Sequence, residues 1–420
     1  MRVGVVGGGL GGLLAGAELA RRGADVVVFE AAPAVGGVAA TIREDGYLLE
    51  PAAGSFPRPH PALDPLLDHA GVDTVERPPP AGRYVSDGGR FRELPSHPLG
   101  VVGLAAALLG PSAVARAAVE PLMPAVATGG ETVGEHLRRR FGPAGGAAAG
   151  LIAGGVFAGD PDRLELAAAF PLLAGLEASH GSILRAVAAR RGSPGPRPAL
   201  HLPVEGMAAL AESLAGAVGD VRTSTPVCDV RRVAGGWEVD GEPVDRVVLA
   251  VAPEVAGGLL GLDLGPNPPT VPVAVVGLGG PVDRVPAPGG FGGLVLADAG
   301  LATLGILFED GPGRAPEGHR LLKVLIGGAR RPASAELPDD LVVSTVLAEV
   351  GPMLGSAVRP EWIRVRRAAI PQYVPGHAAR VAALDAQLAP EVALAGWWYR
   401  GIGVASLAAD AVALADRLGG

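Results

Sequence analysis

The chain has 420 residues, 49% of them apolar and 19% charged, a composition that excludes a disordered polypeptide and is enough for roughly two or three domains. The net charge of −8 and the lack of an extended basic run argue against nucleic acid as a partner. Cys228 is the only cysteine, so disulfides within the chain, Cys-ligated iron–sulfur clusters and Cys-rich zinc sites are excluded, and redox chemistry, if the protein has any, must come from a bound cofactor. Arginine nearly replaces lysine, of which Lys323 is the only example.

The first thirty residues predict one βαβ unit. A β-branched strand begins at Val3 and breaks into glycines. An Ala- and Leu-rich helix follows over residues 10–22, and a second apolar strand covers residues 26–29. No charged leader or signal precedes Val3, so we expect a cytoplasmic protein.

The glycines of this unit have the spacing of a dinucleotide-binding loop. Gly7, Gly9 and Gly12 fit G-x-G-x-x-G, which allows a tight turn, close approach of the backbone to a pyrophosphate, and close packing of helix on strand. Glu30, at the end of the second strand, can accept hydrogen bonds from an adenosine ribose. The alternative is a glycine-rich turn that binds nothing. The complete unit favours a dinucleotide site, without saying which dinucleotide.

The middle of the chain contains two different kinds of structure. A hairpin is expected at residues 43–46, helices dominate residues 95–190, and residues 191–198 form a loop. Short strands begin at residue 226, and the apolar run 244–253 reads as one of them. The later elements are expected as strands near 271–280, 292–309 and 321–327 and a helix near 340–355.

The longest apolar stretch begins at Pro98 and ends at Gly110, which is shorter than the about 20 residues that span a bilayer. Together with the residues up to 127 it could lie in a membrane interface, although a buried pair of helices is the favoured reading.

The C-terminus predicts a second strand–glycine–helix unit. A buried strand ends at Gly396, a glycine-broken turn follows, and an amphipathic helix begins at about Val404. A cofactor in two parts, such as FAD, needs such a unit, because its first half occupies the N-terminal βαβ and its flavin ring needs a second support. A positive helix end near the flavin stabilises its reduced, anionic form. The alternative is a C-terminal helix that only packs.

At this point the sequence resembles a known family, the FAD-dependent protoporphyrinogen and coproporphyrinogen oxidases of the flavin amine oxidase superfamily. VGVVGGGLGGL, Glu30 and the pair Gly36–Gly37 are shared with the superfamily. Closer to the porphyrinogen oxidases are DGYLLEPAAGSF, TVGEHLRRRFG, GGVFAGDPDRLELAAAFPLLAGLEASHGSILRA, IPQYVPGH and YRGIGVASL.

The resemblance implies an α/β fold, in which a Rossmann-like FAD-binding domain is joined to a mixed-sheet substrate domain and a helical lobe. The implied segments are 1–80, 201–260 and 386–420 for the FAD-binding domain, 81–200 for the helical lobe and 261–385 for the substrate domain.

The resemblance also implies the cofactor contacts. The residues that would bind FAD are Gly7, Gly8, Gly9, Leu10, Gly11, Gly12, Glu30, Ala31, Gly36, Gly37, Val38, Ala39, Ala52, Ala53, Gly54, Ser55, Val227, Ile402, Gly403 and Val404. Apart from this resemblance, the sequence predicts that Val227 is an ordinary core residue of a strand.

Two positions depart from the family. Ala52-Ala53-Gly54 stands where the family has Gly-Pro and a polar or charged residue, and Val38 replaces an Arg or Lys. Porphyrinogens carry propionates and need cations, for which arginine is the natural partner. Candidate substrate residues are Arg58, Arg92, His97, His377 and Arg400, and each has a structural alternative. The catalytic residues are unknown, and the chemistry requires no general base.

The implied reaction belongs to heme biosynthesis. A methylene bridge of the porphyrinogen gives a hydride to the flavin, a nitrogen loses a proton, and dioxygen reoxidises the flavin to give hydrogen peroxide. The implied partners are the tetrapyrrole, a downstream heme-pathway enzyme that receives the product, and peripheral membrane contact through residues 98–127. No metal is expected. The alternatives are a related flavin oxidase or desaturase acting on an amine, a polyene or a secondary metabolite, and a non-enzymatic prenyl-protein escort that needs no flavin.

Overall fold

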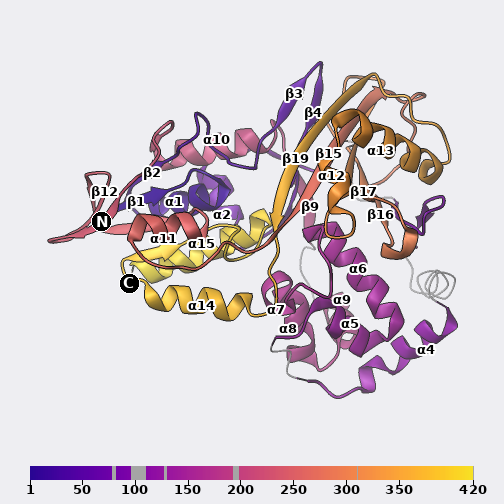
Figure 1. Cartoon of the computed structure of the whole chain (residues 1–420), viewed down its shortest axis with the longest axis horizontal. Coiled ribbons are helices and arrows are strands. Elements are labelled where there is room, and N and C mark those ends of the chain that lie inside the picture. Colours follow the sequence, from indigo (N-terminus) through magenta and orange to yellow (C-terminus); the bar gives the residue numbers. More distant parts are fainter. Residues whose placement is uncertain (78–81, 96–109, 127–129, 193–197, 310, 420) are drawn as a thin grey trace.

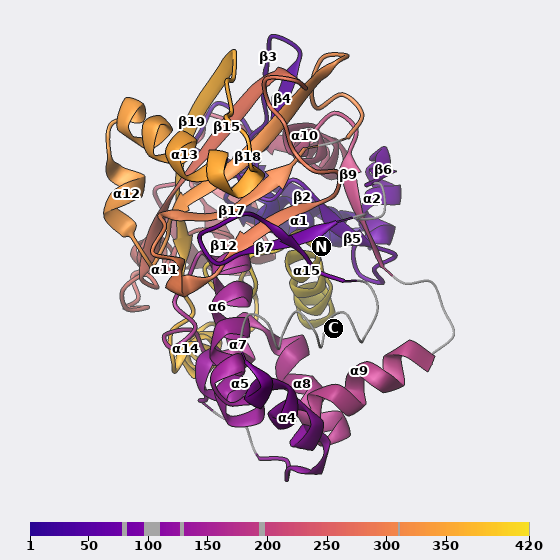
Figure 2. The same ribbon diagram turned by 90° about the vertical axis from the view of Figure 1, so that its right-hand side faces the viewer.

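The computed structural model describes residues 1–77, 82–95, 110–126, 130–192, 198–309 and 311–419. Figure 1 shows three regions: a parallel sheet with its helices, a larger twisted sheet, and a helical lobe below the larger sheet. The view turned by 90° in Figure 2 keeps the helical lobe below that sheet. The predicted fold class is confirmed.

The parallel sheet is assembled from segments far apart in the chain. Its strands are, in spatial order, β10 (Asp220–Arg222), β2 (Asp25–Phe29), β1 (Arg2–Val6), β14 (Arg246–Leu249) and β20 (Val392–Leu394). All four pairings are parallel. The central strands are continuous apolar runs, as expected for a sheet that is covered on both faces.

One face of this sheet carries helices and the other carries a small antiparallel sheet. The helices of the first face are α1 (Leu10–Arg21), α2 (Asp64–His69), α10 (Met207–Val218) and α15 (Val404–Gly419). The second face is covered by β11 (Val230–Val233), β12 (Gly236–Val239), β13 (Glu242–Val244), α11 (Pro253–Leu260) and α14 (His377–Gln387). Buried residues recur along α15 at helical spacing from Val404 to Leu418, so its apolar face packs on α1.

The larger sheet is mixed. Its strands are, in spatial order, β19 (Trp362–Pro371), β15 (Thr270–Pro281), β18 (His319–Gly327), β17 (Thr303–Phe308), β16 (Gly292–Val295), β7 (Arg83–Ser86) and β8 (Arg92–Glu93). Only the β16–β7 pair is parallel. The helices α12 (Pro332–Glu336) and α13 (Asp339–Leu354) pack on this sheet.

The described helices of the lobe are α4 (Pro111–Val119), η1 (Glu120–Leu122), α5 (Val133–Phe141), α6 (Pro143–Phe157), α7 (Leu166–Ala169), α8 (Pro171–His180) and α9 (Ile183–Gly192). The remaining elements are β3 (Ile42–Glu44) and β4 (Tyr47–Leu49), which form the predicted hairpin, the three-stranded set β5 (Phe56–Arg58), β9 (Ala199–Pro203) and β6 (Thr74–Glu76), and the short helix η2 (Ala297–Ala299). Among the described residues, no helix combines the length and apolarity needed to cross a bilayer.

Two sequence-based strand assignments are corrected. The run 244–253 is not one strand, because β14 ends at Leu249 and Pro253 starts a helix, where the missing N–H of proline costs nothing. Residues 292–309 form two strands rather than one. Between them lie η2 and Gly300, whose φ of +73° turns the chain back.

Candidate functional site

The glycine loop between β1 and α1 is held by contacts that exclude side chains. A Cβ at position 12 would lie 2.0 Å from the carbonyl oxygen of Gly7, and Gly7 itself has a φ of +106°. Gly9 differs, since a Cβ there would meet no atom within 4 Å. Gly12 and Gly7 are therefore needed by the fold, whereas the space beside Gly9 is open for something else.

Glu30 ties this loop to the end of β2. Its carboxylate accepts one hydrogen bond from the N–H of Gly8 and another from the N–H of Ala32, both at 2.7 Å. The second glycine pair joins the same place, because the N–H of Gly36 donates to the carbonyl oxygen of Gly8 at 2.8 Å. Gly36 and Gly9 also form an isolated bridge. The sequence motifs around residues 8, 30 and 36 thus meet at one end of the parallel sheet.

The C-terminal unit reaches the same end of the sheet. A Cβ at Gly11 would lie 2.5 Å from the Cα of Gly396, just after β20. The chain then turns and α15 begins at Val404. As at Gly9, a Cβ at Gly403 would meet nothing within 4 Å.

The helices α1 and α15 therefore both begin beside open space, and neither has an acidic residue in its first turn. Helix N-termini carry free N–H groups and partial positive charge, which suits the phosphates and the electron-rich ring of a dinucleotide. Because Gly9 and Gly403 have no Cβ, the space beside each of them stays open for a ligand. These residues fit FAD on the grounds of shape and charge.

The loop after β4 is anchored by the buried carboxylate of Glu50. This carboxylate accepts hydrogen bonds from the N–H of Met207 at 3.0 Å and from the hydroxyl of Thr41, and it pairs with Arg314 at 3.2 Å. Burial nevertheless raises the pKa of Glu50. A Cβ at Gly54 would lie 3.0 Å from the Glu50 side chain, so residues 51–55 pass directly over it.

Lys323 joins the same loop from the larger sheet. Its amine donates a hydrogen bond to the carbonyl oxygen of Ala52, and its side chain is almost entirely buried. Reasoning from the sequence found neither Lys323 nor Glu50 as a site residue. The signal available for Lys323 was that a chain with 35 basic residues keeps a single lysine.

The other predicted cofactor residues are placed as follows. Val38 is exposed, whereas Ala39 is buried in the core beneath the parallel sheet's helices. Val227 is partly buried and packs against the cluster on the opposite face of that sheet. Ile402 packs against the apolar cluster of the helical lobe.

The predicted substrate arginines already have carboxylate partners. Arg58 pairs with Asp64 at 2.8 Å and with Asp68, and Arg400 pairs with Asp385 and with Asp410 at 3.5 Å. These ion pairs agree with the alternative that Arg58 and Arg400 have structural roles.

The remaining predicted substrate residues differ in exposure. Arg92 is half-exposed and lies 3.3 Å from Asp87. The buried ring of His377 stacks on Tyr373 with centroids 4.1 Å apart, and its Nε2 lies 2.9 Å from the carbonyl oxygen of Tyr399. Burial lowers the pKa of His377, so the ring is neutral near neutral pH. His97 lies outside the described residues.

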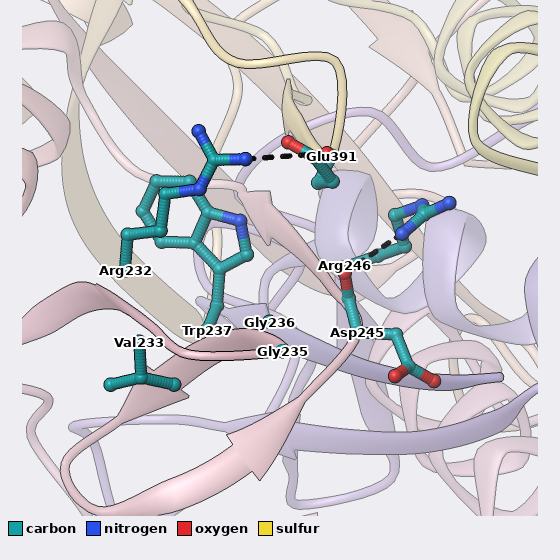
Figure 3. Close-up of a pocket in the computed structure, with 8 residues that line it drawn as sticks. All are labelled: Arg232, Val233, Gly235, Gly236, Trp237, Asp245, Arg246 and Glu391. Carbon is teal, nitrogen blue, oxygen red and sulfur yellow. Dashed lines mark hydrogen bonds and ion pairs between the residues drawn. The ribbon is translucent and has the colours of Figure 1, made fainter.

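Figure 3 shows a separate small hollow of about 210 Å³ between the β11–β12 hairpin and β14. It is lined by Arg232, Val233, Gly235, Gly236, Trp237, Asp245, Arg246 and Glu391. Arg232 lies 3.8 Å from Glu391 across it, and Arg246 bonds back to the Asp245 carbonyl. None of the predicted site residues lines this hollow.

Comparison with known proteins gives one family match and several relatives that align with most of the chain. The family described as flavin containing amine oxidoreductase matches residues 10–409. A coproporphyrinogen III oxidase of Propionibacterium freudenreichii subsp. freudenreichii is 29% identical, with 99% of this chain and 90% of the relative covered. Protoporphyrinogen oxidase 1, chloroplastic, of Arabidopsis thaliana is 28% identical, with 89% and 79% covered.

Among solved structures, one from Exiguobacterium sp. 255-15, proposed to be a protoporphyrinogen oxidase, superposes with a TM-score of 0.80 at 23% identity. The alignment covers 100% of this chain and 99% of that one. At this identity the likeness shows the fold alone.

Proposed function

Because the chain belongs to the flavin-containing amine oxidoreductase family, and so is an FAD-dependent oxidoreductase, we propose that it oxidises a porphyrinogen to the porphyrin with dioxygen as acceptor. The observation that carries the proposal is the likeness, over nearly the whole chain, to relatives named for coproporphyrinogen III and protoporphyrinogen oxidation. The substrate is protoporphyrinogen IX or coproporphyrinogen III, and the reaction belongs to heme biosynthesis.

The site geometry supports a specific role for each part. The loop Gly7–Gly12 and the N-terminus of α1 hold the pyrophosphate, and Glu30 accepts the ribose hydroxyls. Val38, Ala39 and the stretch Ala52 to Ser55 line the ribityl chain and the ring. Val227 lies on the adenine side, and residues 402–404 direct the N-terminus of α15 at the flavin. The open space beside Gly9 and Gly403 supports these assignments.

When bound, FAD supplies the hydride acceptor. The protein's own part is to orient the macrocycle and exclude water, for which no protein base is required. Three successive rounds remove six hydrogens from the macrocycle and reduce three molecules of dioxygen to hydrogen peroxide. Of the proposed substrate arginines, Arg92 is the first to test, since Arg58 and Arg400 each already pair with two carboxylates.

The remaining parts of the proposal concern organisation. The FAD-binding domain comprises residues 1–80, 201–260 and 386–420, the helical lobe 81–200 and the substrate domain 261–385. The protein acts in the cytoplasm and hands its product to a downstream enzyme. For residues 98–127 a buried pair of helices is the favoured arrangement, and peripheral membrane contact is the alternative. Within that segment Val119, Leu122 and Val126 have exposed side chains, and residues 98–109 and 127 lie outside the described part.

The test begins with the visible spectrum of the purified protein, followed by addition of coproporphyrinogen III or protoporphyrinogen IX under air. We expect flavin bands and porphyrin fluorescence that grows faster than in a heat-denatured control. Hydrogen peroxide should form at three molecules for each porphyrin. The faster substrate identifies the pathway branch.

The same sample separates the competing interpretations. Flavin bands that bleach anaerobically with a porphyrinogen and do not return in air would contradict dioxygen as acceptor. Flavin bands without any porphyrin formation would favour the related oxidase that acts on an amine or a polyene. A colourless protein that cannot be reconstituted with FAD would contradict the enzyme and favour the prenyl-protein escort.

A further inference from the structure

Lys323 is a buried cation on the face of β18 that looks toward β4 and the loop 51–55. In the sheet it lies opposite Gly277 of β15. A Cβ at Gly277 would come within 2.8 Å of the Leu49 side chain, so this glycine lets β4 approach the sheet closely. Through that close approach, the Lys323 amine bonds to the carbonyl oxygen of Ala52.

The amine has unused donor capacity. A lysine ammonium can donate three hydrogen bonds, and the described residues give Lys323 one partner, although the side chain is 3% exposed. A buried donor without partners is costly, so such groups normally have water, an ion or a ligand nearby.

The charges around Lys323 are also unbalanced. Among the described residues, the charged side chains with the strongest electrostatic effect on Lys323 are Glu309, Glu50, Arg314 and Arg77, all buried. Arg314 pairs with Glu50 at 3.2 Å, and Arg77 lies 3.9 Å from Glu309. Among the described residues, each carboxylate thus has its own arginine. No ion pair joins Lys323 to a carboxylate of the described residues, so a nearby anion would stabilise its protonated form.

We propose that Lys323 is a positioning residue for the flavin: it holds Ala52 of the loop 51–55 and stabilises negative charge that develops on the bound cofactor. The proposal rests on the part of the proposed function that places this loop against the flavin ring. Burial lowers the pKa of the Lys323 amine in the protein alone, and an anion beside it opposes that effect. The group is therefore best protonated when the cofactor carries negative charge.

Sulfite tests this role without turnover, because it adds reversibly to oxidised flavin, leaves negative charge on the ring and bleaches the visible band. We would compare K323M, which keeps the length of the side chain without its charge, with K323R, which keeps the charge. R330M is the control, because Arg330 is a partly buried cation that donates hydrogen bonds to the carbonyl oxygens of Val295 and Gly150, on other elements. FAD content and the thermal midpoint of each variant are measured alongside.

At saturating FAD, K323M should bind sulfite about tenfold more weakly or worse, as expected for loss of one nearby charge in a partly shielded site. K323R and R330M should stay near the wild-type affinity. Equal sulfite affinity in K323M and wild type would overturn the proposal, and it would mean that Lys323 serves only packing.

If K323M does not retain FAD, the pH dependence decides. With concentrations expressed as the dianion, wild-type sulfite affinity should fall as pH rises through the Lys323 pKa, and K323R should lack this fall because arginine does not titrate. A fall that survives in K323R is not caused by titration of Lys323 and counts against the proposal. Failure of porphyrinogen turnover leaves this test intact, because sulfite needs only bound FAD. An unchanged sulfite affinity in K323M leaves the proposed reaction standing.

Discussion

Gly11 of the first helix and Gly396 after the last strand meet backbone to backbone, with only 2.5 Å between a Cβ at position 11 and the Cα of Gly396. G11A should force α1 away from the C-terminal turn, at a cost of about 1–3 kcal/mol in the free energy of unfolding. It should also weaken FAD binding, because the two helix N-termini lose their relative placement. Chemical denaturation and FAD titration of the apoprotein measure the two effects.

G216A is the matched control, because a Cβ at Gly216 in α10 would meet nothing within 4 Å. In a helix interior this change should stabilise by about 0.5–1 kcal/mol and leave FAD affinity unchanged. If G11A behaves like G216A, the close contact between the two ends of the chain does not constrain the fold.

Substitution of Gly9 or Gly403 should weaken FAD binding without the loss of stability expected for G11A. G9A and G403A add a Cβ where no protein atom lies within 4 Å, so the apoprotein should keep its stability within about 0.5 kcal/mol. FAD should bind at least about tenfold more weakly to each, since one lost contact of 1.4 kcal/mol already gives that factor. Calorimetric titration of the apoprotein checks this. Unchanged affinity in both variants would place the cofactor elsewhere.

Asp410 in α15 should make stability depend on pH. Burial raises the pKa of Asp410 to about 6, despite Arg400 at 3.5 Å. Folding raises the pKa of this carboxyl, so the folded state holds the proton more tightly than the unfolded state does. The free energy of unfolding therefore falls as the pH rises from the pKa of an aspartate in the unfolded chain toward about 6. The side chain at position 410 cannot ionise in D410N. The free energy of unfolding of D410N minus that of wild type should therefore increase by about 1.5 kcal/mol between pH 5 and pH 8. A constant difference across that range would show that Asp410 has an ordinary pKa.

The helical lobe depends on a fully buried ion pair. Arg140 donates to Glu120 through Nε at 2.7 Å, and Glu120 also accepts from the hydroxyl of Ser182. R140M leaves the Glu120 charge buried without its partner and should cost about 3–5 kcal/mol in a denaturation experiment.

Two further variants check the cause of that loss. E120Q/R140M should recover most of the stability, because no unpaired charge remains. R138M removes an exposed partner of Asp162 and should cost less than about 1 kcal/mol. A small loss in R140M itself would mean that water reaches Glu120.

The two ends of the chain were predictable from the sequence because local patterns encode them. The βαβ unit, the hairpin at residues 43–46 and the strand–turn–helix after residue 391 depend on period, glycine spacing and turn residues, and all of them are present. The helix expected over residues 10–22 differs from α1 by one residue at its end.

The interior of the chain was less predictable because tertiary contacts decide it. Strand β19 was missed, since Arg364, Arg366 and Arg367 make its sequence look like a surface loop, although it is an edge strand with partly exposed side chains. The sequence does not distinguish a buried carboxylate such as Glu50 from an exposed one, and although Lys323 stands out as the single lysine, its contacts are known only from the structure. Arg58 is a second example, because its ion pair with Asp64 explains its position without a bound substrate.

Because β20 and α15 complete the parallel sheet and its helical cover, the first thirty residues cannot reach their final packing until the segment after residue 391 has also been synthesised. β1 and β2 leave the ribosome first, but β14 and β20 follow only after about 240 and 390 residues, and the face of α1 that α15 covers stays exposed until then. The apolar face of α1 that α15 covers therefore stays exposed until residues 404–419 have been synthesised.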